Sequence, residues 1–427
     1  MRTHCRWMIC VGIWFLSPQA ASVGEDWPRW RGPRNDGHVA STARVPLTLP
    51  AEPRRVWKQP AGDALASPVV ARGKVFVFDG FGGREVLRAL ARDTGEELWR
   101  QDVDAAFTDS QGPTGPRCTP VVDGDRVYAV SCRGELQCRE IERGTLLWRK
   151  NFVADFGATF IGEKGTTPGA ARHGNNGSPW IQDGRIYVFP GGPQGASIAC
   201  LDKMTGQVLW KSQNAMAGYA PPVLQDVDGK AHLLAFTAEG LMAVSPSDGA
   251  LLWNYPIKTA FGRHVTTPVV HANHVVVSSH QAGLIAMKVN AKGAAVSAEP
   301  AWIQKETAMN ICSPVAIGPS LFGVGPDKNL ICLDLRSGTL HWSKEGVITT
   351  SADRAAAGFL VLGTRVLALT DAGLAVMFEG SKDQYHELGR AQLCGLNWCH
   401  PAYSDGKLFL RDGIKKGGDV YCYDLMP

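Results

Sequence analysis

The fold is decided by a unit that reads CLDKMTGQVLW at residues 200–210. Near-copies read ALARDTGEELW at residues 89–99 and CLDLRSGTLHW at residues 332–342. In each copy a Gly lies in the middle, and a Trp follows it four residues later. Gly permits a tight turn between two strands, and Trp offers a large apolar face to a neighbouring sheet. The unit therefore predicts a strand pair whose indole packs against an adjacent element.

This unit ends a longer repeat, which opens with Ser/Thr-Pro and an apolar run, as at Ser67-Pro68. The repeat tryptophans from Trp57 to Trp342 lie 42, 49, 62, 43, 49 and 40 residues apart. Runs such as KVFVF at residues 74–78 are β-branched and aromatic, and they show no helical periodicity. A period in the forties with four short strands per repeat is typical of a β-propeller blade. A β-sandwich or a solenoid does not explain a Trp that returns at the same place.

The number of blades follows from the two ends of the repeat region. The last copy, from residue 400, has three strands and no fourth, and the copy at about residues 352–393 has lost its Trp. Residues 54–59 have the fourth-strand pattern and complete the last blade, so that no sheet edge stays free. We predict an all-β fold, an eight-bladed β-propeller of four-stranded antiparallel blades closed by the N-terminal strand, with seven blades as the alternative. The predicted blade-docking residues are Trp57, Trp99, Trp148, Trp210, Trp253, Trp302 and Trp342.

The N-terminus predicts a targeting segment. It has a charged start, an apolar run of ten residues and a small-residue exit, which is typical of a signal peptide. A transmembrane anchor is the alternative, but ten residues of helix span only about 15 Å. Cys10 lacks the preceding Leu and small residue of a lipid-attachment site. We predict a signal peptide at residues 1–22, an N-terminal extension at 23–52 and a propeller at 53–427, with the mature chain periplasmic or secreted and without a transmembrane segment.

Charge and cysteine content exclude two kinds of site. The 44 Lys and Arg residues barely exceed the 40 Asp and Glu residues, too few for a protein that binds nucleic acid by neutralising phosphates. The sequence has no Cys-x-x-Cys and no metal-ligand cluster. A disulfide between Cys394 and Cys399 is one interpretation of that pair. Most cysteines fall at two fixed positions of the repeat, which we call columns and which hold small residues in the other blades. This pattern predicts buried thiols. One column holds Cys138, Cys200, Cys332 and Cys422, and the other holds Cys118, Cys312 and Cys399.

Residues 200–210 resemble the tryptophan-docking motif of the pyrroloquinoline-quinone (PQQ) repeat family, whose pattern is Ala-x-Asp-x-x-Thr-Gly-Lys-x-x-Trp. Residues 89–99 and 332–342 are similar, and DWPRWRGP at residues 26–33 resembles the start of secreted bacterial propellers of this type. The resemblance covers roughly residues 53–427. It implies the propeller fold and two kinds of function: a PQQ-dependent dehydrogenase, or a non-catalytic scaffold like that of the outer-membrane assembly machinery.

The dehydrogenases of this family stack the quinone over Ca²⁺, between a Trp and two adjacent disulfide-linked cysteines, and use an Asp as base. This sequence has no two consecutive Cys, and no carboxylate and amide set for calcium can be assigned in it. We therefore assign no catalytic residue and no metal ligand. No cofactor is assured, and PQQ with Ca²⁺ stays as the alternative without its vicinal-Cys platform.

The loops that lead into each Ser/Thr-Pro are expected to surround the axis, with the loop from Asn151 to Gly177 lying over the same face. Amides, imidazoles, arginines and an aromatic on one concave face suit a polar ligand. We predict a monomeric extracytoplasmic propeller that acts as a binding or scaffold module for an envelope protein or a small polar ligand; the alternative is a PQQ-dependent oxidoreductase of unknown substrate. The candidate ligand-binding residues are Arg117, His173, Asn175, Asn176, Tyr219, Arg263, His264, Asn310, Asn397, Trp398 and His400.

Overall fold

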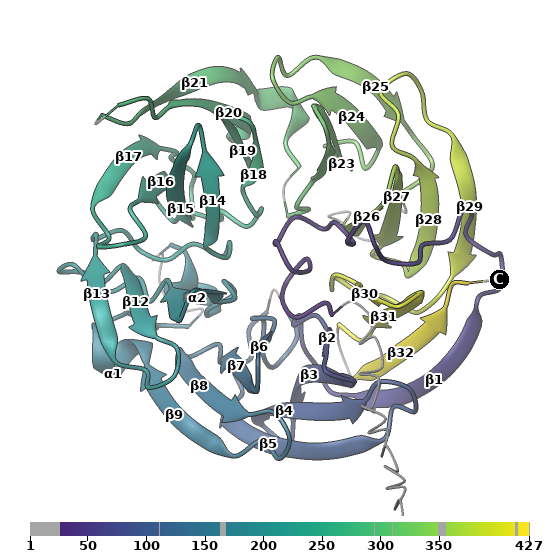
Figure 1. Ribbon diagram of the computed structural model, residues 1–427, viewed down its shortest axis with the longest axis horizontal. Coiled ribbons are helices and arrows are strands. Elements are labelled where there is room, and N and C mark those ends of the chain that lie inside the picture. Colours follow the sequence, from purple (N-terminus) through teal and green to yellow (C-terminus); the bar gives the residue numbers. More distant parts are fainter. Residues whose placement is uncertain are drawn as a thin grey trace, which may run out of the picture.

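Eight four-stranded antiparallel sheets are arranged as blades around a central axis in the computed structural model (Figure 1). In seven of the blades the chain runs from a strand at the axis to a strand at the rim, and in the eighth the rim strand comes from the N-terminal part of the chain (Figure 1). The prediction of an eight-bladed β-propeller is therefore confirmed, and the alternative of seven blades is wrong. The structure describes residues 26–110, 112–162, 168–293, 295–309, 311–348, 356–414 and 417–426, so the predicted signal peptide lies outside the described residues.

The first four blades are built in sequence order from the axis outward. Their strands are β2 (Val69–Ala71), β3 (Lys74–Phe81), β4 (Arg84–Ala91) and β5 (Glu97–Ala105); β6 (Val121–Asp123), β7 (Arg126–Val130), β8 (Glu135–Glu140) and β9 (Leu146–Asn151); β10 (Trp180–Gln182), β11 (Arg185–Val188), β12 (Ile198–Asp202) and β13 (Val208–Ser212); and β14 (Val223–Val227), β15 (Lys230–Thr237), β16 (Gly240–Val244) and β17 (Leu251–Pro256). Two short helices, α1 (Phe152–Phe156) and α2 (Ala170–His173), lie in the connection between the second and third blades.

The other four blades follow the same plan, except that the eighth takes its outer strand from the N-terminal end. Their strands are β18 (Val269–His271), β19 (His274–Ser279), β20 (Gly283–Asn290) and β21 (Ser297–Gln304); β22 (Val315–Ile317), β23 (Ser320–Val324), β24 (Leu330–Asp334) and β25 (Leu340–Lys344); β26 (Ala357–Leu362), β27 (Arg365–Thr370), β28 (Leu374–Glu379) and β29 (Glu387–Gln392); and β30 (Ala402–Ser404), β31 (Lys407–Arg411), β32 (Gly418–Asp424) and β1 (Arg54–Ala61). A 3₁₀ turn at Lys305–Thr307 follows β21.

The repeat tryptophans join each blade to the next. Trp148 lies against the turn of the following blade, where a Cβ on Gly206 would come within 2.7 Å of the indole. The Trp148 Nε1–H also donates to the carbonyl of Lys203 at 3.0 Å. Within its own sheet Trp148 lies opposite Cys138, and this ladder position holds Cys or Ala opposite every repeat Trp because the indole occupies the space beside it. The same indole-to-carbonyl hydrogen bond is made by Trp57, Trp99, Trp210, Trp302 and Trp342.

The seventh blade has no Trp because the eighth has no turn to receive one. The eighth blade is made from both ends of the chain, so its third and fourth strands, β32 and β1, are not joined. In the seventh blade Gly389 stands at the ladder position that holds Trp in the others. Leu49 approaches this Gly so closely that a Cβ there would lie 2.2 Å from the Leu49 carbonyl oxygen. The N-terminal segment thus packs where an indole would otherwise lie.

The ring is closed by antiparallel pairing of β1 with β32, which puts Trp57 opposite Cys422. Figure 1 shows these two strands side by side, purple beside yellow. Arg54 adds an ion pair of 2.6 Å with Asp424 near the end of the pair. Closure by the N-terminal strand, predicted from residues 54–59, is confirmed.

The N-terminal segment of residues 26–49 crosses the centre of the ring before it reaches β1 (Figure 1). Trp27 exchanges backbone hydrogen bonds with Val70 at 2.7 and 2.9 Å, and the Arg29 Nη2 donates to the Ile181 carbonyl at 3.0 Å. These contacts fix the segment across the axis, an arrangement that the sequence does not predict. Its hydrogen-bond partners on or beside the inner strands include Val70, Val122, Ile181, Thr267, Pro314, Ala316, Val361 and Tyr403.

Candidate functional site

The axial cavity lies where the loops leading into the inner strands meet the N-terminal segment, and it has a volume of about 230 Å³. Its side chains are brought together because every blade begins at the axis. The polar lining is Arg117, His173, Asn176, Ser178, Tyr219, Arg263 and Ser313, and the apolar lining is Trp30, Leu65, Pro221, Val265, Ile311 and Trp398.

The hydroxyl groups of the blade-opening dipeptides hold adjacent blades together beside this cavity. The Ser178 Oγ accepts a hydrogen bond from the Thr119 N–H at 2.9 Å, and the Thr119 Oγ1 accepts from the Ser67 N–H at 3.0 Å. Across the ring closure, the Ser67 Oγ accepts from the His400 N–H at 2.8 Å. Where Ser or Thr precedes the Pro, its hydroxyl thus links neighbouring blades, and the resulting rim supports the lining side chains.

Arg117 and His173 share one buried carboxylate, that of Asp109. The Arg117 Nη2 donates to Asp109 at 2.6 Å, and the His173 Nδ1 lies 3.1 Å from the same oxygen. The three side chains are 6, 7 and 0% exposed, respectively. This pairing fixes the guanidinium and the imidazole in the cavity wall, because a buried charge is retained only with a partner.

Tyr219 and Arg263 form another part of the wall. The Tyr219 Oη donates to the carbonyl of Gly169 at 2.7 Å, and burial raises the pKa of this phenol above its usual value. Tyr219 therefore stays neutral at physiological pH. The Arg263 guanidinium lies over the Phe261 ring with its carbon 5.1 Å from the ring centre, so Arg263 brings a positive charge to the cavity.

A side pocket of about 50 Å³ adjoins the axial cavity, and both are lined by Trp30 and Trp398. His400 lines this side pocket; within the described chain neither of its ring nitrogens has a hydrogen-bond partner, and burial holds its pKa well below the usual range. The Asn397 Nδ2 donates to the Thr370 carbonyl at 3.0 Å, so this amide is held by the backbone.

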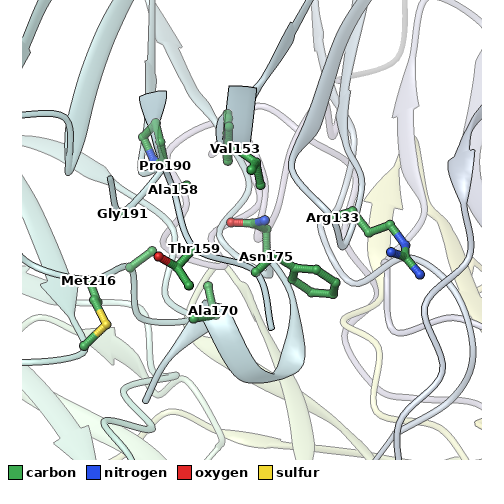
Figure 2. A pocket seen from close by; sticks show the side chains of 13 residues that line it. Arg133, Val153, Ala158, Thr159, Ala170, Asn175, Pro190, Gly191 and Met216 are labelled. Carbon is green, nitrogen blue, oxygen red and sulfur yellow. The ribbon is translucent and has the colours of Figure 1, made fainter. Parts of the chain in front are cut away.

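Two described residues of the predicted set, Asn175 and His264, line neither the axial cavity nor its side pocket. Asn175 lies in a separate pocket of about 20 Å³ beside α1 and α2, near Val153 and Ala170 (Figure 2). His264 is fully buried and stacks on Phe236 at 4.4 Å, and desolvation lowers its pKa to about 4. Asn310 lies outside the described residues.

The structure thus brings Arg117, His173, Asn176, Tyr219, Arg263 and Trp398 together around one cavity, with Asn397 and His400 in or beside the side pocket. Sequence reasoning did not include Trp30, whose Nε1–H donates to the Thr267 hydroxyl at 3.0 Å. Trp30 lies outside the repeats, so no repeat register could have placed it at the axis.

The nine described cysteines are free thiols, and seven of them lie in the two predicted columns. Cys394 and Cys399 are among them, so the structure does not pair these two residues. The Cys399 Sγ donates to the Leu65 carbonyl at 3.5 Å, while burial raises the pKa of this thiol to about 11. A thiol with such a pKa is protonated at neutral pH and is a weak nucleophile. Every described member of both columns is buried: Cys118, Cys138, Cys200, Cys312, Cys332, Cys399 and Cys422.

Within the residues that the structure describes, no group of three or more His, Cys, Asp or Glu residues is placed to hold a metal ion. None of the helices in the same part of the chain has the length and apolar character needed to cross a membrane.

Comparison with known proteins places these features in a family. A family model described as outer membrane protein assembly factor BamB matches residues 83–344, more than half of the chain. The BamB of Yersinia pestis is 25% identical over 220 residues, covering 51% of this chain and 49% of that protein. The BamB of Shewanella oneidensis is 26% identical over 259 residues, covering 56% and 60%. The chain thus spans about half to three fifths of the length of these curated relatives.

Two solved structures share the fold at low sequence identity. BamB from Moraxella catarrhalis has a TM-score of 0.60 at 13% identity, covering 88% of this chain and 98% of that one. A quinohemoprotein alcohol dehydrogenase from Comamonas testosteroni has a TM-score of 0.50 at 15% identity, covering 94% and 82%. Since one is named as an assembly factor and the other as a dehydrogenase, the shared fold does not decide between the two functions.

Proposed function

The chain belongs to the PQQ-repeat propeller family whose model is described as outer membrane protein assembly factor BamB, and from this premise we propose that it is a non-catalytic binding or scaffold module of the cell envelope. The observation that carries the proposal is the match of that family model to residues 83–344. The predicted leader at residues 1–22 supports a position outside the cytoplasm, and the mature chain would act there as a monomer.

The binding surface in this proposal is the axial face. It presents a cavity with charged, amide and aromatic side chains on a rim that hydrogen bonds hold in place. The exposed Leu396 precedes Asn397 and Trp398 in the loop between β29 and β30, so a partner at this face can reach it. A cavity of about 230 Å³ is smaller than most small-molecule sites, which suits a partner whose main contacts lie on the rim.

The alternative of a PQQ-dependent oxidoreductase does not fit the residues at the axis. Calcium takes six to eight oxygen ligands, usually with carboxylates among them. The described lining of the axial cavity includes no Asp or Glu, and the carboxylate behind it, Asp109, is held by Arg117 and His173. The sequence also lacks two consecutive Cys for the quinone platform. We therefore derive no catalytic step.

The scaffold proposal is tested by site-specific crosslinking of the full chain in its native host. A photoreactive amino acid replaces Leu396 beside the axial cavity or, as a matched control, Leu147 on the outer strand β9; both leucines are 45 to 48% exposed. We expect a defined adduct with an envelope protein from position 396 and none from position 147. Equal adducts from both positions, or none from position 396, would contradict the proposal.

A second measurement tests the oxidoreductase alternative. The purified mature protein is incubated with PQQ and Ca²⁺, and its unfolding midpoint and its reduction of a dye with alcohols or sugars are recorded. We expect neither to change. A stoichiometric rise in the midpoint together with dye reduction would replace the scaffold proposal by the enzymatic one.

A further inference from the structure

The axial cavity is lined by apolar side chains that remain partly exposed. One comes from the N-terminal segment, and four come from the loops before the inner strands β2, β18, β22 and β30. They leave uncovered apolar surface around a single space of about 230 Å³. Apolar surface that stays open in a concave site is typical of a binding site. The five half-buried side chains are Trp30, Leu65, Val265, Ile311 and Trp398.

Five polar side chains of the same wall are buried more deeply and are bonded within the protein. They are Arg117, His173, Ser178, Tyr219 and Ser313, which are 3 to 8% exposed. Each makes a hydrogen bond inside the described chain. Three nitrogens of the lining have no partner there, Arg117 Nε, His173 Nε2 and Trp398 Nε1, but these atoms are themselves buried. The surface that the wall offers to a ligand is therefore mainly apolar.

The two indoles of the lining are held in place before any ligand arrives. The Trp30 Nε1–H donates to the Thr267 hydroxyl at 3.0 Å, and the Trp30 ring meets the His400 ring edge-on with centroids 4.8 Å apart. Trp398 follows the buried Asn397, whose side-chain amide bonds to the backbone. Aromatic rings attract a further ring through edge-to-face and offset contacts. A wall that is ordered in advance loses little conformational entropy when it binds.

The size of the cavity limits what can enter it. An apolar cavity of about 150 Å³ accepts benzene, so a cavity of about 230 Å³ has room for one substituted ring, such as a phenol or an indole. Larger organic ligands usually occupy pockets of about 300 Å³ or more. Tyr and Trp side chains are the commonest anchors of protein–protein interfaces, where each fills a pocket of this kind.

We propose that the axial cavity receives one aromatic side chain, a Trp or a Tyr, of the envelope protein that docks on the axial face. This inference rests on the proposed role of that face as a binding surface and names the group that the face recognises. Trp30 and Trp398 supply the aromatic contacts, and the three aliphatic side chains of the lining surround the ring. The exposed Leu396 beside the cavity contacts the residues of the partner next to that ring.

Calorimetric titration of the full mature chain with side-chain analogues tests this inference. The aromatic probes are 3-methylindole and p-cresol, which correspond to Trp and Tyr. Propionamide and butylamine, which correspond to Gln and Lys, are the polar comparisons. We expect at least one aromatic probe to bind once per chain, at least about tenfold more tightly than either polar probe. Equal or tighter binding of a polar probe, or no binding of either aromatic probe up to millimolar concentration, would overturn the inference.

Variants then place the binding site of the aromatic probe. Val265→Phe should weaken its binding by about tenfold or more, because the larger side chain fills part of the cavity. Trp398→Leu should weaken it several-fold, because it removes an aromatic wall. Val208→Phe, at a side chain that is 37% exposed on β13, is the matched control and should leave the affinity unchanged. Unfolding midpoints show whether each variant folds. An unchanged affinity in both cavity variants would remove the axial cavity from consideration.

A capped peptide tests whether the ring belongs to a polypeptide. We expect acetyl-Ala-Trp-Ala-amide to bind at least as tightly as 3-methylindole, since its backbone adds contacts at the rim, and acetyl-Ala-Gln-Ala-amide to bind at least about tenfold more weakly. Binding of 3-methylindole without binding of the Trp peptide would overturn the assignment to a side chain of a partner. Adducts at position 396 without binding of either aromatic probe overturn this inference alone, whereas probe binding without adducts contradicts the scaffold proposal.

Discussion

The Arg411 guanidinium donates a hydrogen bond of 2.5 Å to the Asp79 carboxylate across the seam between the last blade and the first, and both side chains are fully buried. Arg88 donates to the other carboxylate oxygen at 2.9 Å. One buried carboxylate thus pairs with two buried guanidinium groups at the place where the ring closes, and Glu97 pairs with Arg88 at 2.7 Å as well.

Asp79→Asn should destabilise the protein by about 3–5 kcal/mol, because it leaves the buried Arg411 without its counter-charge and leaves Arg88 with Glu97 as its carboxylate partner. Urea unfolding followed by tryptophan fluorescence measures the loss. Asp383→Asn is the control, since Asp383 pairs with Lys382 on the surface, where both side chains are more than 60% exposed. This substitution should change the unfolding free energy little. Equal effects of the two substitutions would show that the seam charges do not stabilise the ring.

The indole hydrogen bonds are tested by comparing two tryptophans. The Trp99 Nε1–H donates to the Ile141 carbonyl at 3.0 Å, whereas the Trp253 Nε1 is buried without a partner in the described chain. Trp99→Phe should therefore be more destabilising than Trp253→Phe by about 1–2 kcal/mol, since only the first loses a hydrogen bond and the second removes an unsatisfied donor. Both values come from denaturant unfolding. A larger loss for Trp253→Phe would contradict this account of blade docking.

The turn glycines that receive an indole should tolerate no side chain. Gly206 has φ +72° and no room beside Trp148, whereas Gly184 has φ +81° and no atom within 4 Å of the place that a Cβ would take. Gly184→Ala should cost about 1–2 kcal/mol from the left-handed backbone alone. Gly206→Ala should cost clearly more, because it also displaces the Trp148 ring. Equal unfolding free energies for the two variants would contradict the close packing of Trp148 against Gly206.

Glu85 makes stability depend on pH. It is fully buried, its carboxylate accepts from the Cys132 N–H at 3.1 Å, and desolvation raises its pKa to about 8. The folded state therefore favours the protonated carboxyl of Glu85. Its contribution to stability is fully present below the unfolded pKa of about 4.5 and is lost as the pH rises through 8. Glu85→Gln keeps the shape without the ionisation.

The variant should therefore gain stability relative to the parent by about 1.4 kcal/mol per pH unit between pH 5 and 8, measured by chemical unfolding at each pH. Glu52→Gln, at an exposed position, is the control. A difference between parent and Glu85→Gln that stays constant over this range would contradict the buried state of Glu85.

The repeats made most of the fold predictable. A Gly and a Trp four residues apart define each blade, and the pattern around Trp57 could be recognised as the missing outer strand because it follows the same rule. The small-residue column was also predictable, since Cys138 and its equivalents lie at a fixed distance before the turn Gly.

The axial site was predictable only in part. The approach to each Ser/Thr-Pro located Arg117 and Tyr219 at the cavity, but the same rule placed His264 there, and that ring turns inward onto Phe236. Loop position does not fix which way a side chain points. Trp30 was missed because the N-terminal segment binds mainly backbone carbonyls, which have no residue-specific signature.

The pairing of β1 with β32 also sets an order of events during folding. The two strands are more than 350 residues apart in the chain, so the contact that completes the ring cannot form until β32 has emerged from the ribosome or a translocation channel. Until then the other seven sheets form an open arc with two unprotected edges, a state that is prone to association with other chains. Release of β32 is therefore the step that ends this vulnerable period, and a protein truncated before Gly418 would remain in it.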